Sequence, residues 1–219
     1  MIDISHPSKE AIKQMIELSK APVIASHSSA RALCDHSRNL DDEQLGWVKE
    51  NGGVVQTVAF TSYVNKEKND ARNAKSSEIQ KQVADSLGVK WLSSRAEFRA
   101  LSDEEREAYM KVRTQVSDIV DAKIEKMPDF PAKVNVSDFV DHIDYLVEKM
   151  GLQHVGISSD FDGGGGVEGW NDASETFNVT LELVKRGYTE EQIEKLWSGN
   201  LLRVLDECEK VAQEIQAGA

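Results

Sequence analysis

A short apolar run that leads through a serine to a histidine, and then into a helix-like segment, occurs twice near the start of the sequence. The first run, residues 1–4, leads to His6, and the second, residues 22–25, leads to His27. Side chains at the carboxyl ends of parallel strands gather at one face of an α/β protein. The repeat therefore predicts two imidazoles at one rim, where they would suit a zinc-like ion. In the alternative interpretation, each histidine only hydrogen-bonds its own loop.

Strand-like and helix-like segments alternate along the chain. The predicted strands are 1–5, 22–26, 54–60 and 154–159. The run 54–60 is β-branched and nearly continuous, as is typical of a buried parallel strand. We therefore predict an α/β fold, either a partial (β/α)8 TIM-type barrel with about four parallel strands or a small open sheet. A complete barrel usually needs roughly 250 residues, and this chain has 219.

Helices account for most of the remaining sequence. They are predicted over 7–19, 41–50, 102–126, 137–150, 173–186, 189–197 and 201–215. Ser102 is expected to cap its helix together with Glu105, and breaks are expected at Gly187 and at Gly199-Asn200. Residues 65–133 are charged and poor in strand signals. We predict a single domain, 1–219, that carries a helical insertion at about 65–133 on the outside of the barrel.

The charge balance excludes one broad class of function. The chain has 38 acidic and 26 basic residues, a net charge of −12, so nucleic acid is an unsuitable partner. No apolar run approaches the roughly 18 residues that a membrane span needs. Residues 1–6 lack the basic start of a signal peptide, and two cysteines cannot form a disulfide framework. A cytoplasmic location is therefore predicted.

Asp160 follows the last predicted strand and precedes four consecutive glycines, 163–166. A carboxylate in this position would suit catalysis or metal binding, but it could equally cap the glycine loop. Asp160 and Asp162 superficially suggest a calcium loop, although the third acid and the final glutamate of an EF-hand are missing. The glycines could form an anion-binding nest, but no dinucleotide or P-loop motif is present.

Arg38 lies eleven positions after His27 in a polar turn. Its guanidinium could hold a substrate carboxylate through a bidentate fork. The alternative is a surface ion pair with one of three nearby acids, Asp35, Asp41 or Asp42. Of the remaining histidines, His36 is predicted to be a loop residue, and His142 and His154 are predicted to be structural.

Several motifs together resemble the membrane (renal) dipeptidase family of zinc peptidases. They are DISH at 3–6, APVIASHSSA at 21–30, SRN at 37–39, DHID at 141–144, the segment 154–163 and GNLLRV at 199–204. The motifs occur in the family's order and cover most of the chain outside 65–133. The resemblance implies a metal-dependent barrel with two zinc ions that cleaves dipeptides ending in a free carboxylate.

The resemblance also implies roles for individual residues. His6 and His27 match the two histidine ligands of one zinc, Arg38 matches the arginine that holds the substrate carboxylate, and Asp160 matches the acid beside the metal-bound water. A metal acidifies water and polarises a carbonyl, and a nearby carboxylate can carry the proton to the leaving amine.

The match is to the carboxyl-terminal half of the family. We expect the family's His-x-Asp pair to be missing from the whole chain, and no residue corresponds to the glutamate that bridges its two metals. Two imidazoles fall short of the three protein ligands of a catalytic zinc. We therefore expect fewer than two zinc ions per chain, and low or no activity in isolation.

Three functional interpretations follow. The chain is a truncated or split metallodipeptidase, a non-catalytic small-molecule-binding or regulatory remnant, or an enzyme completed by another chain. A half barrel leaves two sheet edges unpaired, which favours a homo-oligomer or a complementing amino-terminal half as partner, beside the dipeptide substrate.

Overall fold

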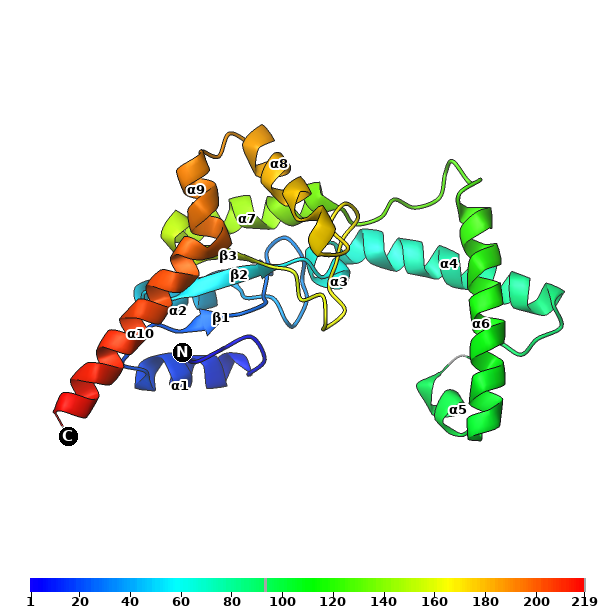
Figure 1. Ribbon diagram of the computed structural model, residues 1–219, viewed down its shortest axis with the longest axis horizontal. Helices are drawn as coiled ribbons and strands as arrows, with labels where there is room; N and C mark the ends of the chain where they lie inside the picture. Colours follow the sequence, from blue (N-terminus) through cyan, green and yellow to red (C-terminus); the bar gives the residue numbers. More distant parts are fainter. Residues whose placement is uncertain (93, 219) are drawn as a thin grey trace. The chain divides into compact units, whose positions relative to one another are not determined.

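The computed structural model describes residues 1–92 and 94–218, which form two compact units (Figure 1). The first unit comprises Met1–Lys66 and Lys133–Ala219, and it contains the sheet and all the predicted site residues. The second unit, Glu67–Ala132, lies inside the segment for which a helical insertion is predicted. No helix of the described residues is long and apolar enough to cross a bilayer.

The first unit is built on a parallel sheet with the order β1-β2-β3. The strands are β1 (Ile24–Ala25), β2 (Val54–Val58) and β3 (Val155–Ser158). Every residue of β2 is buried, as expected for the central strand of a parallel sheet covered by helices. The predicted α/β class is therefore confirmed.

The first predicted strand shrinks to a single parallel bridge between Asp3 and Ile24. Ile4 N–H donates to the Ile24 carbonyl at 2.8 Å, and Ile24 N–H donates to the Ile2 carbonyl at 2.9 Å. Beyond the bridge the Asp3 carboxylate accepts the N–H of Ser5, which turns the chain out of strand geometry. The sheet of the described residues thus has three strands rather than the expected four.

Helices pack around this sheet (Figure 1). They are α1 (Lys9–Leu18), α2 (Asp42–Glu50), α3 (Thr61–Val64), α7 (Val136–Met150), α8 (Phe177–Lys185), α9 (Glu190–Glu194) and α10 (Asn200–Ala217), with short 3-10 turns at Leu152–His154 and Ala173–Glu175. Helix α7 contacts β2 and β3 and also α2 and α8. It buries Phe139, Ile143 and Leu146 completely, so its apolar side forms the centre of the core.

The predicted break at Gly199-Asn200 is wrong, because a π-helical turn, Lys195–Gly199, joins α9 to α10 without interruption. Gly199 has helical backbone angles. The buried Asn200 amide donates to the carbonyls of Leu152 at 2.7 Å and Val155 at 2.8 Å. This amide therefore ties the continuing helix to the start of β3 instead of ending it.

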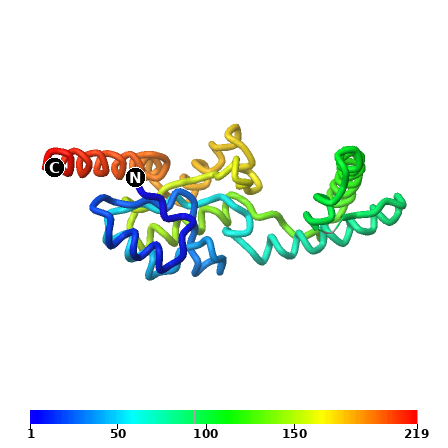
Figure 2. Tube along the Cα trace, turned by 90° about the horizontal axis from the view of Figure 1, so that it is seen from below, coloured from blue at the N-terminus to red at the C-terminus, as the bar shows by residue number. Residues whose placement is uncertain are grey.

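Helices are the regular elements of the second unit's described residues. They are α4 (Lys66–Ser86), α5 (Arg95–Arg99) and α6 (Asp103–Ile124) (Figure 2). The predicted capping box at the start of α6 is confirmed: Glu105 N–H donates to Ser102 Oγ, and Ser102 N–H donates to the Glu105 carboxylate at 2.7 Å. A small apolar core of its own is formed by Ile79, Val83, Val116 and Val120.

Candidate metal centre

The two predicted imidazoles face each other at one edge of the sheet. His6 follows the Asp3 bridge and His27 follows β1, and these neighbouring segments run in parallel. Their Nε2 atoms are 2.9 Å apart, and their rings meet edge to face with centroids 4.8 Å apart. Two imidazole nitrogens that converge in this way form a pair of potential ligands for one metal ion.

Arg38 reaches the same point from the following loop. Its Nη2 atom lies 3.2 Å from His6 Nε2 and 3.0 Å from His27 Nε2. Its Nε donates to the carbonyl of Ser5 at 3.2 Å, and its guanidinium lies 5.7 Å from the ring centre of Tyr63. The structure thus brings a guanidinium and two imidazoles into one cluster.

The alternative of a surface ion pair for Arg38 does not match the structure. Asp41 lies 2.7 Å from Lys9, and Asp42 lies 3.1 Å from Lys149. Among residues 1–92 and 94–218, no salt bridge joins Arg38 to Asp35, Asp41 or Asp42, and the last two pair with lysines at the start of α2.

Asn39 holds the loop that carries this arginine, a role that the sequence analysis did not predict. The side chain is completely buried. Its oxygen accepts the N–H of Ser29 at 3.1 Å, and its nitrogen donates to the carbonyls of Cys34 and Tyr63 at 2.9 and 2.7 Å. A polar turn that places an asparagine next to a candidate arginine is the only local signal that could have indicated it.

His142 is a structural residue, as predicted. It is 1% exposed; Ala30 N–H donates to its Nδ1 at 3.1 Å, and its Nε2 donates to the Val64 carbonyl at 2.8 Å. Burial lowers the pKa of this imidazole, against the hydrogen bond to Val64, which raises it. The neutral ring thus joins α7 to the loop after β1 and to the end of α3.

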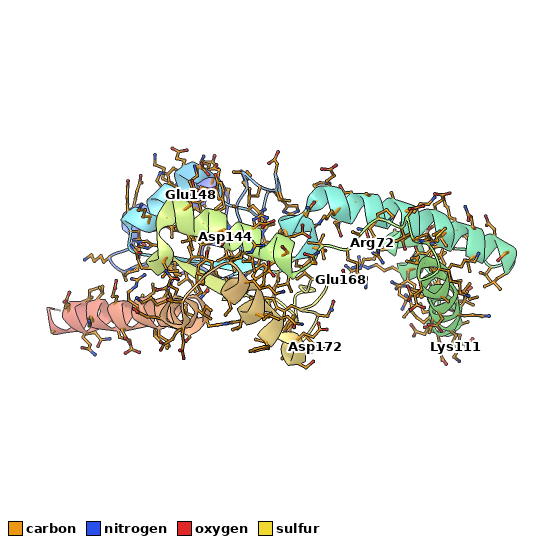
Figure 3. The ribbon with its side chains drawn as sticks, turned by 90° about the horizontal axis from the view of Figure 1, so that it is seen from above. Arg72, Lys111, Asp144, Glu148, Glu168 and Asp172 are labelled. Carbon is orange, nitrogen blue, oxygen red and sulfur yellow. The ribbon has the colours of Figure 1, made fainter. Side chains whose placement is uncertain are left out.

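The chain does contain one His-x-Asp triplet, at 142–144. Both residues lie on α7, but their side chains bond different partners. Asp144 (Figure 3) accepts hydrogen bonds from Arg186 at 2.6 Å and from Tyr188 at 2.7 Å. Because both polar side chains are already bonded in the packing of α7, the triplet is not part of the rim cluster.

The other two histidines also have structural contacts. His36 Nδ1 accepts the N–H of Arg38 at 3.2 Å, and its ring stacks on Tyr63. His154 Nδ1 bonds the carbonyl of Gly53 at 2.8 Å. The predictions for these two residues are confirmed.

Behind His27 lies a polar chain that sequence reasoning missed. Ser26 Oγ donates to Asp3 Oδ2 at 2.5 Å and lies 2.7 Å from His27 Nδ1. The backbone N–H of His27 donates to Ser5 Oγ at 2.9 Å. The DISH and ASH segments therefore supply both the imidazoles and the hydrogen bonds that hold one of them.

Asp160 lies directly beyond β3 in a left-handed conformation, with φ of 52°. Its carbonyl accepts the N–H groups of Gly163 at 3.0 Å and Gly165 at 2.7 Å. A Cβ at Gly163 would lie 2.4 Å from Asp160 Oδ1, and one at Gly165 would lie 2.0 Å from the Ser159 carbonyl. The glycines are therefore required by the sharp turn that places this carboxylate.

The electrostatics of the cluster favour a neutral His27. Burial lowers the pKa of His27; Asp160 opposes this effect, whereas Arg38 and His6 reinforce it. Neutral imidazole is the form that binds metal ions. Among residues 1–92 and 94–218, however, no group of three or more His, Cys, Asp or Glu side chains is arranged to hold a metal. The two imidazoles fit one metal ion as a partial ligand set, one short of a typical catalytic zinc.

Comparison with known proteins gives a consistent family. The family model described as membrane dipeptidase, peptidase family M19, matches residues 1–219. Human dipeptidase 3 is 30% identical over 99% of this chain and 32% of its own length. Dipeptidase aclJ of Aspergillus oryzae is 28% identical over 98% of this chain and 36% of its own length.

A solved structure agrees with these relatives. The probable dipeptidase PvdM of Pseudomonas aeruginosa is 37% identical and superposes with a TM-score of 0.65, covering 96% of this chain and 50% of that protein. The chain thus spans about a third of the curated relatives and half of this structure. Because the family model matches the whole sequence, the chain belongs to peptidase family M19, the membrane dipeptidases.

Proposed function

We propose that this chain supplies the histidine ligands and the carboxylate-binding arginine of a zinc-dependent dipeptidase, which hydrolyses dipeptides with a free C-terminal carboxylate. The observation that carries the proposal is the convergence of His6 Nε2, His27 Nε2 and Arg38 Nη2, with separations of 2.9 to 3.2 Å. A metal-binding pair beside a guanidinium can engage the peptide bond and the terminal carboxylate of one short substrate.

Each side chain has a separate task in this proposal. His6 and His27 hold the zinc ion, which when bound supplies Lewis acidity at the scissile carbonyl. Arg38 binds the terminal carboxylate, since a guanidinium offers a planar fork of donors. Asp160 accepts a proton at the rim and delivers it to the leaving amine. Its electrostatic effect on His27 supports a position close to the imidazoles.

The ligand set determines how much of this reaction the chain can perform alone. A catalytic zinc normally has three protein ligands, and no such group occurs among the described residues. We therefore propose that the chain is the carboxyl-terminal half of a (β/α)8 barrel, with weak or absent activity alone. Its coverage of half of PvdM supports this interpretation.

An open sheet edge and an apolar groove mark the surface where a complementing half would bind. The bridge to Ile24 uses the groups of Ile2 and Ile4, so the backbone N–H and C=O of Asp3 point to the opposite side. Beside this edge, the exposed side chains of Met1 and Ile2 line a groove of about 390 Å³ against α10. Unpaired edges favour association, and sedimentation as a stable monomer would count against it.

The lack of a third ligand in the described part of the chain also favours a second candidate function, a non-catalytic family member that binds a small carboxylate. The two functions differ in turnover. In the first, zinc-dependent hydrolysis of simple dipeptides is weak and disappears in His27→Ala. In the second, dipeptides bind through Arg38 without hydrolysis at any zinc concentration.

The assignment is tested by zinc binding and dipeptide binding in three chains: wild type, His27→Ala and Arg38→Lys. We expect fewer than two zinc ions per wild-type chain, weaker zinc binding in His27→Ala, and weaker dipeptide binding with unchanged zinc binding in Arg38→Lys. Zinc-dependent turnover that survives His27→Ala would contradict the assignment.

A further inference from the structure

Asp3 is the end of a hydrogen-bond chain that leads to the candidate metal ligand His27. Its Oδ1 accepts two backbone N–H groups, from Ser5 at 3.1 Å and Ser26 at 3.0 Å. Its Oδ2 accepts the hydroxyl of Ser26 at 2.5 Å. Three donors on one carboxylate leave no doubt about its role as an acceptor, because an ionised carboxylate has no hydrogen to give.

The direction of each hydrogen bond in the chain follows from counting protons. Ser26 has a single hydroxyl hydrogen, and this hydrogen is given to Asp3. Ser26 Oγ can therefore only accept from His27 Nδ1, which lies 2.7 Å away. A neutral imidazole has one N–H, so placing it on Nδ1 leaves the lone pair on Nε2.

The contact of Arg38 on the opposite side of the ring fits the same tautomer. Arg38 Nη2 lies 3.0 Å from His27 Nε2, and a guanidinium can only donate. This contact is satisfied when His27 Nε2 accepts, which again places the hydrogen on Nδ1; His6 Nε2, 2.9 Å away, is then the donor of the imidazole pair. Ser26 and Arg38, one on each ring nitrogen, thus favour the same protonation pattern.

We propose that Asp3 and Ser26 are positioning residues that fix His27 as the Nδ1–H tautomer and so present Nε2 to the metal. The inference rests on the proposed function in one respect, that His27 is a metal ligand. Partners of the second nitrogen of a metal-binding histidine commonly orient the ring and set its tautomer. Here a serine stands between the carboxylate and the ring.

His6 provides an internal comparison. His6 is exposed, and its Nδ1 makes no hydrogen bond among residues 1–92 and 94–218. The chain through Asp3 therefore acts on one of the two imidazoles. His27 is the ligand that is oriented before the metal arrives, and His6 adjusts to it.

Asp3→Asn is a sharp test because it reverses the direction of the hydrogen bonds from residue 3 to His27 while keeping the size of the side chain. The amide oxygen must stay on the two backbone N–H groups of Ser5 and Ser26, which places the amide NH2 against Ser26 Oγ. The hydroxyl then turns to donate to His27 Nδ1. The substitution should therefore raise the population of the Nε2–H tautomer, whose Nε2 cannot bind a metal.

The tautomer is measured in the metal-free chain from the 15N resonances of the histidine rings. We expect His27 Nε2 in the pyridine-type range and Nδ1 in the pyrrole-type range in the wild type, with a shift toward the reverse pattern in Asp3→Asn. The resonances of His6 should change less. Asp35→Asn, which removes an exposed carboxylate from the loop that carries Arg38, is the matched charge control and should leave both rings unchanged.

Zinc affinity gives a second readout. Loss of the hydrogen-bond partner of a metal-binding histidine typically weakens metal binding about 10- to 100-fold. For Asp3→Asn we expect zinc affinity to fall about 10-fold, because Asp3 is exposed. Ser26→Ala should weaken binding similarly, and Ser26→Thr, which keeps the hydroxyl, should restore it.

The outcomes separate this inference from the proposed function. A wild-type His27 with its hydrogen on Nε2, or an Asp3→Asn variant with an unchanged tautomer, would overturn the positioning role. A tautomer that reverses as expected in a chain that never binds zinc would keep the hydrogen-bond chain and overturn the proposed metal site instead.

Discussion

Replacing His142 with phenylalanine should destabilise the first unit strongly, because it keeps an aromatic ring but removes both hydrogen-bonding nitrogens. The change leaves the Ala30 N–H and the Val64 carbonyl without the partners that the imidazole provides at 3.1 and 2.8 Å. Each unsatisfied buried group costs about 1–3 kcal/mol. The free energy of unfolding should therefore fall by about 2–6 kcal/mol for the two groups together.

Urea unfolding followed by near-ultraviolet circular dichroism measures this loss, and hydrogen exchange at the Ala30 amide locates it. Glu148→Gln is the matched control, because Glu148 is exposed on the same helix (Figure 3). Such surface changes usually stay within about 0.5 kcal/mol. If His142→Phe also stays within that range, the imidazole does not hold the loop after β1 and our interpretation of the site's framework is wrong.

The same residue gives the stability a pH dependence of known sign. Burial lowers the pKa of His142 in the folded chain, so below about pH 6.5 the unfolded chain binds more protons than the folded one. Its stabilising contribution is present above that pH and is lost as the pH falls toward the lowered pKa. The loss on acidification should be smaller in His142→Phe than in the wild type.

Four further substitutions, one of them a control, test the framework. Gly165→Ala should lower the melting temperature, because its Cβ would meet the Ser159 carbonyl at 2.0 Å. The control Gly46→Ala, whose Cβ would have no atom within 4 Å, should raise the free energy of unfolding by roughly 0.5–1 kcal/mol. Equal effects of the two substitutions would refute the turn argument. Arg186→Lys loses contacts to three acids on α7 and α8 and should cost roughly 1.5–3 kcal/mol in chemical denaturation; an unchanged midpoint would show that the fork is dispensable. Asn39→Ala removes three hydrogen bonds and should weaken calorimetric binding of dipeptides by displacing the adjacent arginine; tight binding would mean that the loop is held by other contacts.

Local sequence patterns predicted the parts of the fold that depend on local interactions. The strand in Val54–Val58, the capping box at Ser102 and the helix end at Gly187 each depend on residues a few positions apart. The continuous helix through Asn200 was missed because its amide bonds carbonyls 45 and 48 positions away. The first strand was overestimated because a side chain, that of Asp3, competes for the backbone.

The residues of the candidate site also divide into those that local patterns predicted and those that they missed. Two strand-end histidines were sufficient to predict a pair of imidazoles at one rim, because parallel strands bring their carboxyl ends together, whereas Arg38 was assigned to this site only by the family resemblance. Ser26 and Asp3 were hidden because their role appears only when the two segments pair side by side. Their significance lies in a hydrogen-bond direction, which residue spacing does not encode.

X-ray absorption at the zinc edge of the chain loaded with one equivalent of zinc tests the central claim most directly. Our account predicts imidazole scattering with nitrogen at about 2.0–2.1 Å, and loss of that signal in a His6→Ala, His27→Ala double variant. A sulfur shell at about 2.3 Å, the distance typical of a cysteine ligand, or a spectrum unchanged in the double variant, would contradict it.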